Sequence, residues 1–201
     1  MKFSGNKKLL LAAIILLAAF LLNIAGYRLL PSAALAFITA TVIYAAVFAC
    51  LLIVTKEHLS PAGVLIALGV TVLFFAVDRC LTLLSVSLIA ALIYQIIRPV
   101  IAAALIVFAG RLIMKTKIGF NPKIAIAAGV AFLLHAAVSV LSYFSLAESA
   151  GFAAAVFLGN IYSLLVSFLT YAIIFIAFCA VTSQISGEKA VTGGQSDAEN
   201  V

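Results

Sequence analysis

The sequence predicts an all-α fold, an integral membrane bundle of six transmembrane helices with both termini in the cytoplasm. Of the 201 residues, 67% are hydrophobic and only 9% are charged, and the mean hydropathy is +1.35. A soluble domain of this length has too small an interior to hide that much apolar surface. In addition, the apolar residues form runs of about 20, the length with which a helix crosses a bilayer. The solvent for most of this chain is therefore lipid.

The expected spans are separated by short segments that contain proline or charged residues. Pro31 precedes the second span, Lys56 follows it, and Pro61 begins the third. The polar tail at 184–201 has no apolar face to bury, so we expect it to be disordered and cytoplasmic. We expect 1–183 to form one membrane domain, whose spans are 9–26, 32–55, 61–78, 86–114, 124–145 and 150–182.

The first span begins like a secretory signal peptide, because Lys2, Lys7 and Lys8 precede its apolar run. However, the segment 23–26 lacks the small residue that cleavage requires three positions before the cut, and further spans follow. We therefore expect an uncleaved first span.

Pro99 lies inside the fourth span and allows two alternatives to a single crossing: two separate crossings at 81–97 and 100–114, or a re-entrant break. The distribution of Lys and Arg favours six spans, because it then leaves only Arg28 and Arg79 on the outside. Seven spans would place the basic segment 111–123 outside. We therefore expect a multi-pass protein of the cell membrane with six spans. A re-entrant break at Pro99 is kept as an alternative for the fourth span.

Polar side chains concentrate in the outer half of each expected span, and the inner halves are apolar. In the fourth span, Tyr94, Gln95 and Arg98 lie within an arc of roughly 120° on one helix face. We expect an outward-facing polar pocket with Arg98 and His135 at its floor, near the middle of the bilayer. The candidate ligand-binding residues are Arg98, Tyr94, Gln95, His135, Ser139, Asn160, Ser163 and Tyr44.

Arg98 is the most informative of these residues, since a charge near the middle of a membrane segment costs roughly 2.5–3.5 kcal/mol on insertion scales. The neighbouring Pro99 removes the helical hydrogen bond to the carbonyl of Gln95 and leaves an acceptor to be satisfied. A guanidinium holds a carboxylate or phosphate with two hydrogen bonds. We expect a small polar or anionic ligand from the outside. The sign of its charge stays open because Asp78, interpreted with Arg79 as an interfacial charge pair, is also able to neutralise Arg98.

The same residues exclude several other functions. The net charge of +6 comes from short basic clusters between apolar runs, so it reflects topology and does not indicate nucleic-acid binding. Cys50, Cys80 and Cys179 are odd in number and are expected to be small packing residues instead of a disulfide or metal framework. The sequence has neither paired carboxylates nor a glycine-rich phosphate loop in the membrane. We expect no catalytic residues, no metal and no cofactor.

These features favour a small-solute transporter or a substrate-binding transport subunit. A first alternative is an assembly subunit of a membrane complex, which would bind a membrane-protein partner through the small-residue ridge at Gly151, Ala155 and Gly159. A second is an intramembrane enzyme acting on a lipid-linked substrate, with His135 as base and Ser139 as nucleophile.

In length, number of spans, position of the termini and outer pocket, the chain resembles the substrate-binding components of energy-coupling factor vitamin transporters. The resemblance covers the whole chain and is one of architecture. It implies a coupling membrane subunit and ATPases as partners. The span 9–26 lacks the pair of alanines four residues apart through which such proteins often dock on that subunit.

Overall fold

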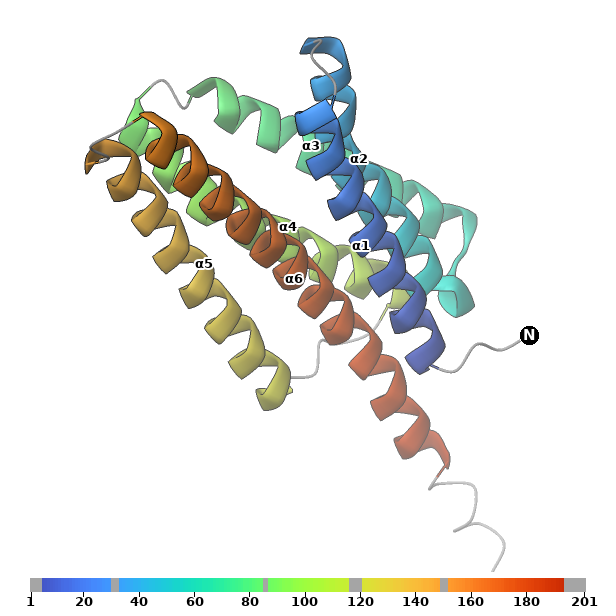
Figure 1. Cartoon of the computed structure of the whole chain (residues 1–201). Coiled ribbons are helices and arrows are strands. Elements are labelled where there is room, and N and C mark those ends of the chain that lie inside the picture. Colours follow the sequence, from blue (N-terminus) through green and yellow to red (C-terminus); the bar gives the residue numbers. More distant parts are fainter. Residues whose placement is uncertain (1–4, 30–32, 85–86, 116–120, 149–151, 194–201) are drawn as a thin grey trace, which may run out of the picture.

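The computed structural model of the chain describes residues 5–29, 33–84, 87–115, 121–148 and 152–193, with the backbone alone at 5, 27–29, 33–40, 88, 145–148, 152–158 and 184–193. These residues form six α-helices and no strand (Figure 1). The helices are α1 (Gly5–Leu29), α2 (Ala33–Val54), α3 (Pro61–Leu84), α4 (Leu88–Met114), α5 (Pro122–Glu148) and α6 (Phe152–Gly193), and a short 3-10 helix, η1 (Lys56–His58), follows α2.

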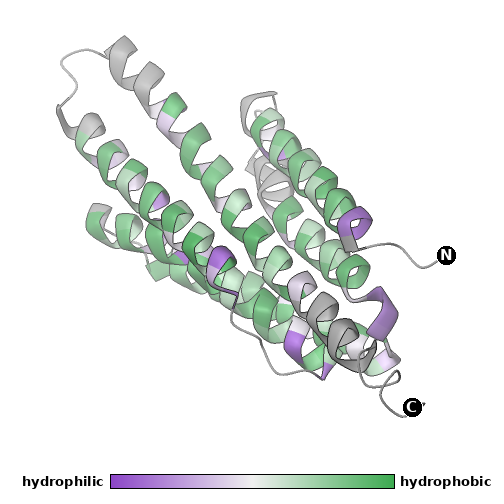
Figure 2. Ribbon diagram, turned by 90° about the horizontal axis from the view of Figure 1, so that it is seen from below, coloured by the Kyte–Doolittle hydropathy of each residue, from purple (hydrophilic) through white to green (hydrophobic). Residues whose placement is uncertain are grey.

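The helices have the length and composition of membrane spans. Five of them contain a stretch long and apolar enough to cross a bilayer, and α2 is 22 residues long with an apolar part at Thr41–Val54. Hydrophobic residues run along the helices, and hydrophilic residues gather mainly near helix ends (Figure 2). The prediction of an all-helical, six-helix, multi-pass membrane protein is confirmed. The side of the membrane on which the termini lie stays a prediction.

The local sequence explains where several helices begin and end. Ser60 precedes α3, and its hydroxyl accepts a hydrogen bond from the backbone N–H of Gly63 at 3.1 Å. Ser87 caps α4 in the same way, accepting from the N–H of Ala90 at 3.2 Å. Lys115 adopts a left-handed conformation, with φ of 56°, at the end of α4.

Between these two ends α4 is continuous, and Pro99 lies inside it. Both alternatives suggested by this proline, the re-entrant break and the two separate crossings, are therefore wrong. The last helix, α6, extends to Gly193, so the described part of the chain is helical through the first part of the tail for which the sequence predicts disorder. Residues 194–201 lie outside the described residues.

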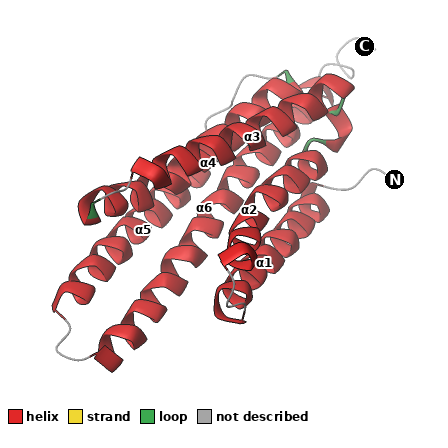
Figure 3. Ribbon diagram, turned by 90° about the horizontal axis from the view of Figure 1, so that it is seen from above, coloured by secondary structure: helices red, strands yellow, loops and turns green. Residues whose placement is uncertain are grey.

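The central helix of the bundle is α6, which packs against α1, α2, α4 and α5 (Figure 3). Consecutive helices alternate in direction, and this gives the bundle two distinct ends. At the first end, called here the cavity end, α1, α3 and α5 finish and α2, α4 and α6 begin. The other, called the terminal end, holds the start of α1 and η1.

The core lies in the half of the bundle toward the terminal end, and it is apolar. Leu16, Leu51, Ile106 and Phe178 are among its buried side chains. The helices α4 and α6 approach closely there, because a Cβ added at Gly110 would lie 2.7 Å from a methyl carbon of Val181.

One ion pair at the terminal end connects α1 to η1. The ammonium nitrogen of Lys8, at the start of α1, lies 3.3 Å from a carboxylate oxygen of Glu57 in η1. Lys8 is buried, so this pair fixes the N-terminal turn of α1 against the connection between α2 and α3.

Candidate functional site

The site is organised around Asp78, a buried carboxylate near the end of α3. It accepts a hydrogen bond from the Tyr44 hydroxyl of α2 through Oδ2 and one from the Tyr94 hydroxyl of α4 through Oδ1, the latter at 2.5 Å. Nε of Arg98 lies 2.6 Å from the same Oδ1. Asp78 therefore joins three helices. Its pairing with Arg98 is the possibility that the sequence left open, and the carboxylate is buried. The third helix continues past this residue to Leu84, whereas the sequence predicts that the span ends at 78.

The guanidinium of Arg98 contacts Asp78 on one side and is partly exposed on the other. Its contact with Asp78 runs through Nε, and the N–H there is not aligned with the carboxylate oxygen, so the contact is an ion pair without a hydrogen bond. The side chain is 31% exposed, whereas that of Asp78 is 3% exposed. Of these two charges, the guanidinium is thus the one that remains accessible.

The accessible part of Arg98 forms part of the wall of a cavity of about 590 Å³ at the cavity end of the bundle. All six helices contribute residues to this wall, and most of these residues are polar. The lining residues are Asn23, Ile43, Thr82, Ala91, Tyr94, Gln95, Arg98, Ser142, Gly159, Ser163, Val166, Ser167, Thr170 and Tyr171. Below the cavity, in the half toward the terminal end, lies the apolar core.

Near the cavity the described charges do not cancel. Arg98 and Asp78 form a neutral pair, but Arg79 adds a second guanidinium, whose Cζ lies 6.0 Å from the centroid of the Tyr44 ring and 5.4 Å from that of Phe75. Two guanidinium groups around one carboxylate leave one excess positive charge among the described side chains of this region.

His135 and Ser139 lie behind the cavity wall and do not line it. His135 is fully buried on α5, and its Nε2 lies 3.1 Å from the hydroxyl of Thr170 on α6, which does line the cavity. Ser139 is also buried, one helical turn further along α5. Within the described residues, its hydroxyl and Nδ1 of His135 have no hydrogen-bond partner. Contact of His135 with a solute in the cavity would therefore go through Thr170.

Of the eight predicted site residues, four meet at the cavity: Tyr94, Gln95, Arg98 and Ser163. Tyr44 is buried behind them, on Asp78. Asn160 is half-buried on α6 but does not line the cavity. Sequence reasoning omitted Asp78, Thr82 and Thr170 from the site.

Little of the small-residue ridge is described. Gly151 and the side chain of Ala155 lie outside the described residues. Gly159, Ser163 and Ser167, which continue the ridge along α6, line the cavity. These three residues keep α6 narrow where the cavity is.

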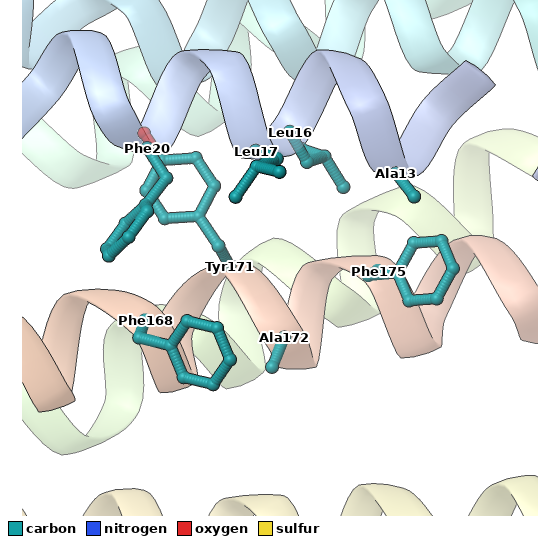
Figure 4. Close-up of a pocket in the computed structure, with 8 residues that line it drawn as sticks. All are labelled: Ala13, Leu16, Leu17, Phe20, Phe168, Tyr171, Ala172 and Phe175. Carbon is teal, nitrogen blue, oxygen red and sulfur yellow. The ribbon is translucent and has the colours of Figure 1, made fainter. Parts of the chain in front are cut away.

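A second hollow, of about 200 Å³, is an apolar groove between α1 and α6 (Figure 4). Phe20 meets Phe168 and Tyr171 edge-on there, with ring centroids 5.9 and 5.7 Å apart. Tyr171 also lines the polar cavity, so its ring stands between the two hollows. The composition of this groove suits lipid chains and offers nothing to hold a polar solute.

Comparisons with models of protein families, with curated proteins and with solved structures gave no match. Within the described residues, no three His, Cys, Asp or Glu side chains converge in a way that would hold a metal ion.

Proposed function

We propose that this membrane protein binds a small anionic solute in the cavity and serves as its transporter or as the substrate-binding subunit of a transport system. The observation that carries the proposal is the position of Arg98 in the wall of a cavity of about 590 Å³. That volume lies within the range of about 300–1,000 Å³ that is usual for small-molecule sites.

The sign of the solute's charge follows from which charged groups reach the cavity. Arg98 lines it, whereas Asp78 is almost completely buried behind Arg98. Because Asp78 contacts Nε and Arg98 lines the cavity, we infer that a terminal nitrogen of the guanidinium is available to a carboxylate or phosphate. The hydroxyl of Ser163 and the amide of Gln95 provide hydrogen-bond donors around that position, whereas the hydroxyl protons of Tyr94 and Thr82 are already donated to Asp78.

A transport role accounts for the contrast between the two halves of the bundle better than a channel does. A channel needs a polar path across the whole membrane, but the half toward the terminal end is filled by apolar side chains and closed by the Lys8–Glu57 pair. A cavity open at one end suits a solute that is released after a conformational change or passed to a partner protein.

The two alternative functions lack a comparable observation. The ridge on which the assembly function depends is described only in part. For the enzyme, Ser139 and His135 would have to act as nucleophile and base. In the described structure Nε2 of His135 contacts Thr170, and the hydroxyl of Ser139 has no hydrogen-bond partner.

Thermal unfolding of the purified protein tests the proposal. Acetate, succinate and inorganic phosphate would be compared at equal ionic strength with the neutral solute glycerol. We expect at least one anion to raise Tm saturably, since a ligand at about 100 times its Kd stabilises a protein by about 2.7 kcal/mol. The effect should be lost in Arg98→Gln and kept in Arg111→Gln, a matched variant of an exposed arginine at the other end of α4. Equal stabilisation of both variants would refute the proposal.

A further inference from the structure

His135 combines complete burial with an unused proton acceptor. The ring is 0% exposed, and among the described residues Nδ1 has no hydrogen-bond partner. Ser139, the next residue on the same face of α5, has an equally unpartnered hydroxyl. Buried polar atoms are normally paired, so two adjacent exceptions call for an explanation.

The hydrogen bonds of Thr170 determine which nitrogen of the neutral ring carries the proton. The single hydroxyl proton of Thr170 is donated to the backbone carbonyl of Val166 at 2.9 Å. The hydroxyl oxygen is therefore an acceptor in its contact with His135, and Nε2 of His135 must be the donor at 3.1 Å. Nδ1 is then the basic nitrogen, and it is the atom that takes up a proton.

Arg98 is a charged group that acts electrostatically on the ring of His135, which is itself fully buried. From α4, the charge of Arg98 acts on the ring, and the other ionisable group at that level is the Tyr94 phenol. Asp78 of α3 is the counterion of Arg98. From α6, His135 meets the hydroxyl of Thr170, which does not ionise.

The remaining ionisable group on α6 at this level is Tyr171, whose ring packs on Phe20 of α1. Arg98 lines the cavity directly, and His135 contacts Thr170, which lines it as well.

We propose that His135 is a proton-binding site linked to the cavity, so that an anionic solute at Arg98 and a proton at Nδ1 of His135 bind together. The positive charge of Arg98 opposes a second positive charge on His135. An anion in the cavity neutralises that charge and favours protonation, and by reciprocity the protonated ring favours the anion. The solute class is therefore an anion that is bound together with a proton. This inference rests on the proposed function.

The chain contains only two histidines, so nitrogen-15 NMR of labelled histidine observes this site directly. A His58→Gln background removes the exposed histidine of η1 and leaves His135 alone. In that background we expect the neutral ring to carry its proton on Nε2. A neutral ring protonated on Nδ1 would contradict the hydrogen-bond assignment and overturn the proposal.

Two variants shift the charge near His135 in opposite directions. Arg98→Gln removes the positive charge and leaves the carboxylate of Asp78, so we expect the midpoint of His135 protonation to rise. Asp78→Asn alone leaves Arg98 without its counterion, and the midpoint should fall. Arg111→Gln should change nothing. The opposite signs keep the proposal testable if one of the two variants fails to fold.

A midpoint that stays constant in the folded variants, or moves in the opposite direction, would overturn the proton link. The solute site is tested separately by the Arg98-dependent thermal stabilisation. If an anion stabilises the protein through Arg98 while the midpoint of His135 protonation does not change with that charge, the proposed function stands and the proton link is refuted. If His135 responds but no tested anion binds through Arg98, the link between the two charges holds while the solute class is refuted.

Discussion

Asp78→Asn is the most informative stability variant, because it removes one charge from the centre of the site and preserves the shape of the side chain. Removing one partner of a buried ion pair typically costs about 3–5 kcal/mol. Here the Arg98 side chain is 31% exposed, so water in the cavity offsets part of that cost. The new amide oxygen still accepts a hydrogen bond from Tyr44 or Tyr94. We therefore expect a loss of about 2–4 kcal/mol in the free energy of unfolding.

Equilibrium unfolding in mixed micelles with a rising fraction of denaturing detergent measures this loss. The reasoning also predicts how the variants combine. Asp78→Asn strands the Arg98 guanidinium, whereas Asp78→Asn with Arg98→Gln removes both charges. The double variant should thus lose at least about 1 kcal/mol less than the sum of the two single losses. Strict additivity, or a loss below about 0.5 kcal/mol for Asp78→Asn, would refute the ion pair as the element that holds α3 against α4.

Two further predictions concern the half of the bundle toward the terminal end. Gly110→Ala should lower the free energy of unfolding by about 1–3 kcal/mol, because the added methyl would overlap Val181. The control Gly69→Ala, which has nothing within 4 Å of the added Cβ, should be neutral or stabilising. Equal effects of the two variants in detergent unfolding would contradict the close approach of α4 and α6. Glu57→Gln should destabilise the protein more than Lys8→Met does. Glu57→Gln leaves the buried Lys8 ammonium unpaired, whereas Lys8→Met replaces it with an apolar side chain of similar length. The reverse order of unfolding midpoints would show that Lys8 is not buried.

The sequence was sufficient to predict the helices because each depends on local properties. Apolar length identifies a span, and Pro61 marks a start that the structure also uses. The contrast between a polar half and a dry half is also visible in the sequence, because it depends only on depth along each helix. The re-entrant break and the two separate crossings suggested by Pro99 were wrong, because a membrane helix accommodates a proline when neighbouring groups satisfy the freed carbonyl.

The pairing of side chains across helices was only partly predictable. Asp78 sits next to Arg79, and the sequence offered both Arg79 and Arg98 as its partner. The rotation of α3 turns the carboxylate toward Arg98 on α4, and the choice between the two partners depends on helix packing, which no local pattern reveals. His135 has the depth of Arg98 but is separated from the cavity by Thr170, because α5 packs closely on α6. Depth was predictable, whereas helix rotation was not.

The proposed function requires a positively charged cavity that opens at one end of the bundle beside Arg98. A single cysteine at Ser163, in a background without the three native cysteines, places a thiol in the cavity wall. Its rates of reaction with an anionic and a cationic methanethiosulfonate reagent would be compared, each divided by the rate with a free thiol. A cysteine at Ala109, buried in the dry half, serves as the unreactive control.

We expect the cysteine at 163 to react from one side of the membrane, to prefer the anionic reagent, and to lose that preference in Arg98→Gln. A thiol that does not react, or one that prefers the cationic reagent, would contradict the account.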